Sequence, residues 1–187
     1  MGKNIVQIGA NKGYDDLTDI VNKFDKKEIE LLVLIEPNHT LNAHLMQCYN
    51  GFNYKIENVV ITPNNDKKTE TFFFCELDLL SSLSIEHIRK HKVGQPTHQV
   101  EYPAITINNL FNKYNLKEID ILFIDAEGFD DQIIYSIDFD NFNIKELYYE
   151  HIHIDNTKIE PFLESKGYKI VKNLFKDGFT NRAIKSI

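Results

Sequence analysis

Apolar runs and amphipathic stretches alternate along the chain, in the order expected of strands and helices that follow one another. Continuous apolar runs, typical of strands buried on both faces, occur at residues 5–8, 31–35 and 119–125. Weaker strand patterns are found at 54–57, 72–76, 100–105 and 145–150. The alternation predicts an α/β fold, in which a doubly wound, mostly parallel sheet is covered by helices on both faces.

Helical periodicity fills the stretches between these runs. Apolar side chains recur at intervals of three and four residues over 17–24, 41–48, 107–114 and 159–163. Residues suited to helix starts precede the first three of them: Asp15 and Asp16, then Asn38 or Thr40, then Thr106. Each predicted helix therefore has a buried face, and the first three also have a plausible start.

The C-terminal pattern differs from the rest. Residues 168–175 and 180–187 flank a hairpin-type turn, Asp177-Gly178, and predict an antiparallel ending to the sheet. Residues 72–105 are less regular and include a polar loop at 90–99, so we interpret them as an insertion. Without repeats or linkers, residues 1–187 are expected to form a single domain, either complete or cut from a longer protein.

The composition is that of an ordinary globular protein, with 42% hydrophobic residues among 187. No apolar run approaches the roughly 20 residues of a membrane helix and no signal peptide is visible, so we expect a cytoplasmic protein without a membrane partner. Cys48 and Cys75 each lie in an apolar context without metal-ligand spacing, so we expect both to be reduced thiols in the core. The net charge of −7, with only Arg89 and Arg182 as arginines, disfavours nucleic acid as a partner.

The first strand ends in Gly9-Ala10-Asn11-Lys12-Gly13, directly before a helical pattern. Glycines at a strand end let a ligand approach bare backbone, and the start of a βαβ unit holds nucleotide-like ligands against a helix N-terminus. The spacing is not the G-x-G-x-x-G of dinucleotide sites, which argues against hydride transfer. An unrelated tight turn is the alternative.

Glu36 directly follows the second predicted strand, in Glu36-Pro37. The ends of neighbouring parallel strands line one crevice, where a carboxylate can accept both hydroxyls of a ribose. A solvated loop carboxylate is the alternative.

Asp125 and Glu127 leave the end of the strongest strand two residues apart, before Gly128. Like charges at this spacing resist joint ionisation, so the pKa of one carboxyl can rise into the range of a general base. Alternatively the two share a divalent cation, or they bond the loop and cap a helix.

Glu150, His151 and His153 leave the next strand. An H-x-H pair on one face can bind zinc, but no third ligand joins it convincingly. One histidine in an acceptor pocket, as base or hydrogen-bond donor, is the favoured interpretation, and a structural role is the alternative. Ser81 and Ser82 lack the elbow and base of a nucleophile, and either contact a ligand or start a helix.

Together, G-A-N-x-G at 9–13, E-P at 36–37, S-S-L at 81–83 and I-D-x-E-G at 124–128 resemble the FkbM-type S-adenosylmethionine-dependent methyltransferases, from about residue 5 to 168. The resemblance implies a class I methyltransferase fold, which is Rossmann-like, and O-methylation of a hydroxyl, often on a sugar. It also implies possible fusion to glycosyltransferase modules in a longer chain.

By the same resemblance, the turn holds the methionine part of the cofactor, Glu36 and Pro37 the ribose, and Asn58 and Val59 the adenine. The turn residues concerned are Gly9, Ala10, Asn11 and Gly13. Gln7 stands where many members have Asp, which implies an amide contact to the ammonium group of the cofactor.

We therefore expect an O-methyltransferase that moves the methyl group of S-adenosylmethionine to a hydroxyl on a sugar. The expected catalytic residues are Asp125 and Glu127, with Glu150 and His151 behind them. Asp125 is also expected to contact the cofactor. The expected acceptor contacts are Ser81, Ser82, His98, Tyr102 and His153. A metal-assisted methyltransferase with Asp125 and Glu127 on Mg²⁺ is possible but not favoured, and a non-catalytic module that binds nucleotide or glycan is the other alternative.

Overall fold

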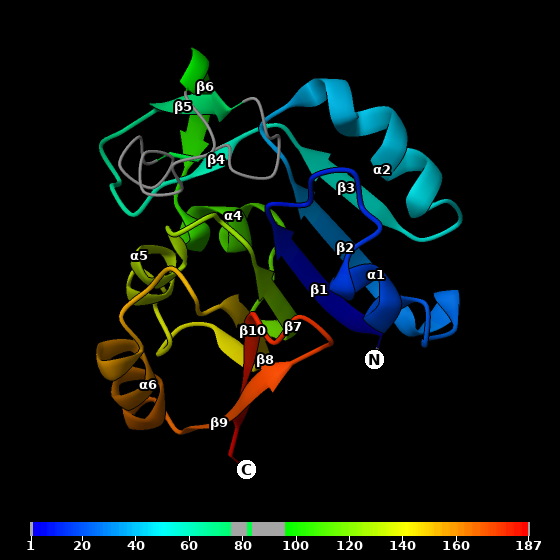
Figure 1. Cartoon of the computed structure of the whole chain (residues 1–187). Coiled ribbons are helices and arrows are strands. Elements are labelled where there is room, and N and C mark those ends of the chain that lie inside the picture. The colour runs from blue at the N-terminus through cyan, green and yellow to red at the C-terminus, as the bar shows by residue number, and fades with distance from the viewer. Residues whose placement is uncertain (1, 76–81, 84–95, 187) are drawn as a thin grey trace.

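The computed structural model of this protein describes residues 2–75, 82–83 and 96–186. Its main feature is a seven-stranded sheet with the order β3-β2-β1-β7-β8-β10-β9 (Figure 1). The strands are β1 (Lys3–Ile8), β2 (Ile29–Ile35), β3 (Tyr54–Glu57), β7 (Glu118–Ile124), β8 (Asn143–Glu150), β9 (Tyr168–Leu174) and β10 (Thr180–Lys185). The first five in sheet order are parallel, whereas β10 runs antiparallel to both β8 and β9. The predicted fold class is confirmed.

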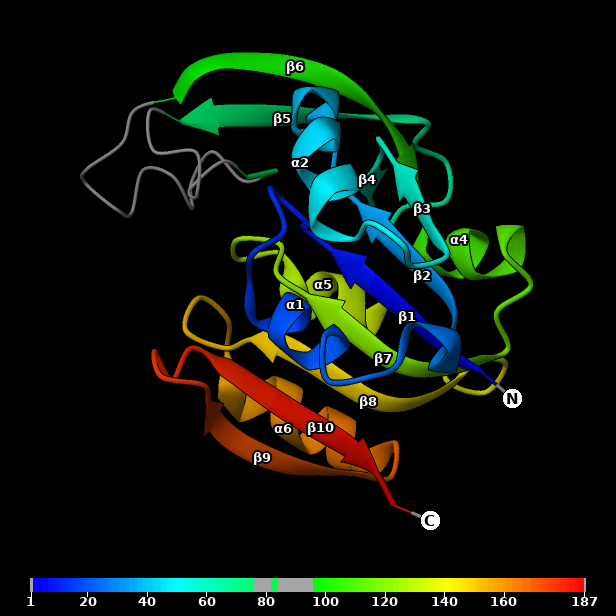
Figure 2. The same cartoon turned by 90° about the vertical axis from the view of Figure 1, so that its right-hand side faces the viewer.

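Helices cover both faces of the sheet (Figure 2). One face carries α1 (Asp16–Val21) and α2 (Asn42–Cys48), and the other carries α4 (Ile107–Lys113), α5 (Asp130–Tyr135) and α6 (Asn156–Ser165). Two short 3₁₀ turns, Lys26–Glu28 and His39–Leu41, precede β2 and α2. Alternation along β1 separates the two cores: Ile5 packs with α1 and α2, while Val6 packs with α4, α5 and α6.

Polar side chains fix the helix starts. Asp15 accepts a hydrogen bond from Thr18 N at 3.0 Å and caps α1, and Thr106 accepts one from Asn109 N at 3.3 Å and caps α4. Asn38 caps the 3₁₀ turn before α2, and Gly167 follows α6 at φ +85°. The starts of α1 and α4 and the end of α6 agree with the predicted ones, whereas α2 itself begins after Leu41, which makes no side-chain capping bond.

A smaller sheet stands apart from the main one, with the order β4-β6-β5. It comprises β4 (Val60–Ile61), β5 (Thr69–Cys75) and β6 (Pro96–Ile105), and β5 and β6 form a long antiparallel ribbon. In Figure 2 this ribbon lies beyond the β3 side of the main sheet. The predicted polar loop at 90–99 is wrong for residues 96–99, which belong to β6. The sequence did not indicate a strand there because residues 97–100 are exposed and show no apolar alternation.

Candidate active site

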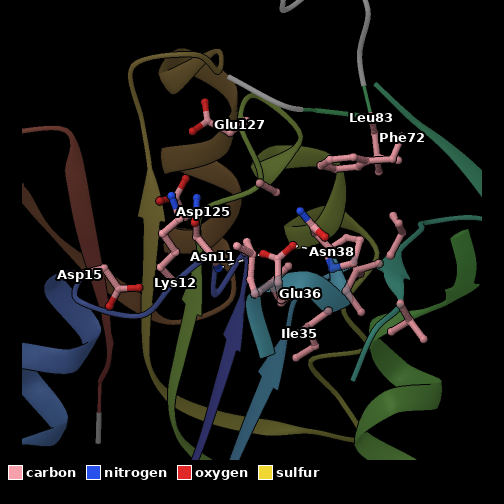
Figure 3. Close-up of a pocket in the computed structure, with 18 of the residues that line it drawn as sticks. Asn11, Lys12, Asp15, Ile35, Glu36, Asn38, Phe72, Leu83, Asp125 and Glu127 are labelled. Carbon is pink, nitrogen blue, oxygen red and sulfur yellow. Dashed lines mark hydrogen bonds between the residues drawn. The ribbon is translucent and has the colours of Figure 1, made fainter. Parts of the chain in front are cut away.

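A cavity of about 430 Å³ opens at the carboxyl ends of β1, β2 and β7. Figure 3 shows Asn11, Glu36 and Asp125 around these strand ends, with Phe72 and Leu83 facing them from the side of the ribbon. Crevices at the carboxyl ends of an open parallel sheet are the usual ligand sites of such folds. The cavity therefore lies where the sequence predicted a ligand.

The glycine turn is packed tightly against the neighbouring strand end. Gly9 has φ +78°, and a Cβ atom added to it would lie 1.8 Å from the carbonyl oxygen of Asp125. The backbone N–H groups of Gly9 and Ala10 both donate to the carbonyl of Ile35 at 3.0 Å. Only glycine fits at position 9, so the turn fixes the ends of β1, β2 and β7 relative to one another.

Glu36 is the polar centre of the β2 end and is 7% exposed. Its Oε2 atom accepts a hydrogen bond from Asn11 N and its Oε1 atom one from Asn38 N, both at 2.8 Å. Burial raises its pKa, while the two hydrogen bonds oppose that shift. Glu36 lines the cavity and also holds the glycine turn, so it is not a solvated loop carboxylate.

Asp125 lies at the end of β7 and lines the cavity. Its Oδ1 atom is buried and has no hydrogen-bond partner among the residues that the structure describes. Burial, followed by the charges of Glu127 and Asp15, raises its pKa to about 7. Such a carboxyl group exchanges a proton at neutral pH, as a general base must.

Glu127 also lines the cavity, and its backbone is in the left-handed region at φ 47°. Its carbonyl oxygen accepts a hydrogen bond from Ser82 Oγ at 2.9 Å. Ser82 is 1% exposed and pairs with Phe73 in an isolated bridge, so this serine fixes the loop after β7. Its side chain does not line the cavity, unlike that of the adjacent Leu83.

Asp130, which the sequence analysis missed, joins the ends of β7 and β8. Its fully buried carboxylate accepts hydrogen bonds from Ala126 N at 3.2 Å and from Glu150 N at 3.1 Å. Burial and the charges of Asp125 and Glu150 raise its pKa well above the ordinary value. An acidic residue two positions after the D-x-E-G segment was the available signal.

Glu150 and the two histidines after it diverge. Burial and the charges of Asp125 and Glu127 raise the pKa of Glu150 to about 8. His153 turns toward it, with 3.8 Å between His153 Nε2 and Glu150 Oε2. The ring of His151 instead donates to the carbonyl of Gly178 at 2.9 Å. His151 thus anchors the β9–β10 hairpin and is not part of the cavity, contrary to its predicted role as a base.

The comparison with known families decides the class. The methyltransferase FkbM domain matches residues 7–170 of the chain. The chain belongs to this family. No curated protein matches it. The resemblance of the four motifs is confirmed, and the cavity is the candidate active site of an FkbM-type methyltransferase.

The predicted contact of Gln7 with the ammonium group of the cofactor is not supported by the structure of this methyltransferase. Its side chain is fully buried and does not line the cavity. It donates to Asp15 Oδ2 at 2.6 Å and accepts from the Tyr49 hydroxyl at 3.2 Å. Because position 7 points into the core under α1 and α2, the group that Gln7 presents to the cavity is the carboxylate of Asp15.

The predicted adenine contacts divide in the same way. Val59 lines the cavity with Val60 and Ile61. Asn58 does not, since its side chain donates to the carbonyl of Glu36 at 2.8 Å and pairs with Asn42 at 2.9 Å. The side chain of Ala10 packs in the core, whereas Asn11, Gly13 and Pro37 line the cavity.

The predicted acceptor residues of the methyltransferase lie mostly behind the cavity wall. His98 is exposed and stacks on Phe74 with 4.5 Å between ring centroids, and Tyr102 meets Phe72 edge-on at 6.1 Å. Phe72 and Phe74 line the cavity, while His98 and Tyr102 support them. Ser81 lies outside the described residues.

The described part of this methyltransferase contains no helix that is both long and apolar enough to cross a membrane.

Proposed function

We propose that this methyltransferase transfers a methyl group from S-adenosylmethionine to a hydroxyl group of a saccharide. One observation carries the proposal: a single cavity joins a glycine turn and a buried carboxylate, Glu36, to a second carboxylate, Asp125, whose pKa is about 7. The glycine turn and Glu36 suit a nucleoside, and Asp125 suits proton removal from an acceptor.

The residues present fit this cofactor. Glu36 offers carboxylate oxygens for the two ribose hydroxyls, and Leu41, Val59 and Ile61 offer an apolar surface for a flat ring. Asp15 and Asp125 place negative charge near the turn, which complements a ligand with a positive sulfur and a positive ammonium group.

When bound, S-adenosylmethionine supplies an electrophilic methyl group on a positively charged sulfur. The turn and Glu36 would hold this cofactor, with Glu36 at its ribose. Asp125, which lines the same cavity, would take the proton of the acceptor hydroxyl when that oxygen receives the methyl group. Alignment of the reacting atoms lowers most of the barrier, and proton removal adds a second contribution.

The saccharide acceptor is supported by the wall formed by the ribbon. Phe72 and Phe74 present aromatic rings to the cavity, and such rings pack against the apolar faces of sugars. The net charge of −7 disfavours polyanions. A cytoplasmic location and fusion to glycosyltransferase modules remain predictions that accompany this proposal.

Calorimetry with S-adenosylhomocysteine tests the cofactor. We expect micromolar binding, and we expect Glu36→Gln to weaken it by about 1.5–3 kcal/mol, the range for hydrogen bonds to a charged group. Glu30→Gln is the matched control, since Glu30 lies exposed near the opposite end of the same strand. Wild-type protein that does not bind, or equal binding by both variants, would refute the cofactor assignment.

Transfer from labelled S-adenosylmethionine tests the acceptor. We expect label on neutral oligosaccharides of a panel and none on RNA, DNA or protein. Label on a polymer other than a saccharide would contradict the proposed acceptor. Binding of the cofactor without transfer to any acceptor would favour a non-catalytic binding module.

A further inference from the structure

Glu127, Glu150 and His153 form a cluster at the ends of β7 and β8. One ligand atom from each side chain lies within 4.8 Å of the other two. The side chains of Glu150 and His153 are 15% and 17% exposed, so the cluster is sheltered from solvent. The fold thus brings Glu127, from the loop after β7, next to Glu150 and His153 at the end of β8.

One potential ligand atom of the cluster accepts no hydrogen bond from the described residues. Glu150 Oε2 is buried and makes no hydrogen bond to any described residue, although His153 Nε2 lies 3.8 Å away. A buried carboxylate oxygen without a donor is costly, and a cation beside it would remove that cost.

The backbone around the cluster is held in place by other residues. Asp130 accepts a hydrogen bond from Glu150 N, and Asn156 donates to the carbonyl of His151 at 2.8 Å. Ser82 fixes the backbone of Glu127. These contacts hold the backbone from which the three side chains project, and a fixed backbone is what a pre-organised site requires.

We propose that Glu127, Glu150 and His153 bind a divalent cation of the first transition row. Two carboxylates and one imidazole balance its charge and are the ligand types that Mn²⁺ and Zn²⁺ accept. This assignment differs from a cation on Asp125 and Glu127, because the cluster unites Glu127 with Glu150 and His153. Since Glu127 also lines the cavity, the ion would lie at its edge.

Calorimetric titration of EDTA-treated protein with Mn²⁺, and separately with Zn²⁺, at about pH 8 tests the site, because metal binding requires deprotonated ligands. We expect one ion per chain, and affinity at least about tenfold lower in Glu150→Gln and in His153→Ala. The matched controls are Glu164→Gln and His44→Ala, at exposed positions on α6 and α2, and they should bind as the wild type does. Circular dichroism of each metal-free variant verifies that it is folded.

The proposal is overturned if neither ion binds, or if both ligand variants bind as tightly as the wild type. The titration contains neither cofactor nor acceptor. Its result is therefore independent of whether the methyl transfer proposed above is correct.

Discussion

The two sides of the cavity treat their carboxylates differently. On the side of β1 and β2, Glu36 accepts backbone hydrogen bonds at both oxygens, and Asp15 accepts from Thr18 and Gln7. On the side of β7, Asp125 lines the cavity, and Glu150 at the end of β8 does not. Asp125 Oδ1 and Glu150 Oε2 are both buried, and neither accepts a hydrogen bond from any residue that the structure describes.

This contrast separates shape from chemistry. A carboxylate with both oxygens bonded fixes the backbone that a ligand meets, and its geometry is already set. A buried carboxylate without donors destabilises the fold, and such groups cluster where a protein binds protons or cations during function. Under the proposed function, the first side recognises the cofactor and the second carries out the reaction.

The strongest way to break the recognition side is Gly9→Ala. The added Cβ would meet the carbonyl of Asp125 at 1.8 Å, so the backbone must move. We expect a loss of about 2–4 kcal/mol in the free energy of unfolding, together with loss of S-adenosylhomocysteine binding. Gly167→Ala is the control, because its φ is +85° but its nearest neighbour lies at 3.9 Å. In urea titrations Gly167→Ala should cost only about 1–2 kcal/mol; equal losses would show that the close packing at Gly9 is unimportant.

The reaction side is tested by Asp125→Asn. Without a carboxylate to take the proton, turnover should fall at least about 10²-fold, a typical contribution of general acid–base catalysis. Affinity for S-adenosylhomocysteine, which lacks the positive sulfur, should fall far less than turnover, since Glu36, Asp15 and the glycine turn are intact. Steady-state kinetics and calorimetry on one preparation separate the two effects. A variant with wild-type turnover would show that Asp125 is structural.

The pH dependence of stability sharpens the contrast further. The pKa values of Asp125 and Glu150 are raised to about 7 and about 8 in the folded protein, so both groups favour folding below their ordinary pKa values. As the pH rises, the unfolded chain ionises first and the folded state loses stability, until both groups ionise in the fold as well. We compare the double variant Asp125→Asn, Glu150→Gln with the wild type by urea unfolding in the presence of EDTA. The free energy of unfolding of the variant should be higher by about 1–3 kcal/mol at about pH 8, and by less at about pH 5.

If the double variant exceeds the wild type in stability by less at about pH 8 than at about pH 5, the raised pKa values of Asp125 and Glu150 are wrong.

The smallest expected effect concerns the ribbon. Phe72 lines the cavity and Tyr102 supports it edge-on, so Phe72→Ala should raise the KM for the saccharide by about tenfold and Tyr102→Ala by less. Affinity for the cofactor should stay unchanged in both. If only Tyr102→Ala raises KM, then Tyr102 itself contacts the sugar.

The sequence predicted the parts of the fold that depend on local patterns. The continuous apolar run of β7 and the Thr106 cap of α4 were both visible in it. Helix α5 was not predicted, because its six residues contain only a short apolar stretch, Ile133 to Tyr135, and no repeat of apolar positions over two turns. The first residues of β6 were missed because their ladder is exposed, and exposed strands need no apolar alternation.

The site was predictable where a polar residue directly follows an apolar strand, as at Glu36 and Asp125. It was not predictable where a side chain's direction decides its role. Gln7 and Asn58 have suitable chemistry but turn to Asp15 and Asn42 instead. Asp130 could not be assigned because its contacts depend on how α5 packs under two strand ends.

The position of β1 has a consequence for how the chain folds. This central strand pairs with β7, and the hydrogen bond from Asn4 N to Asp120 spans 116 positions of sequence. During synthesis one edge of β1 therefore stays open until β7 has left the ribosome. Pairing across such separations is slow, and an open apolar strand invites aggregation in the meantime. Efficient production of this protein is thus expected to depend on chaperones that shield the N-terminal half of the nascent chain.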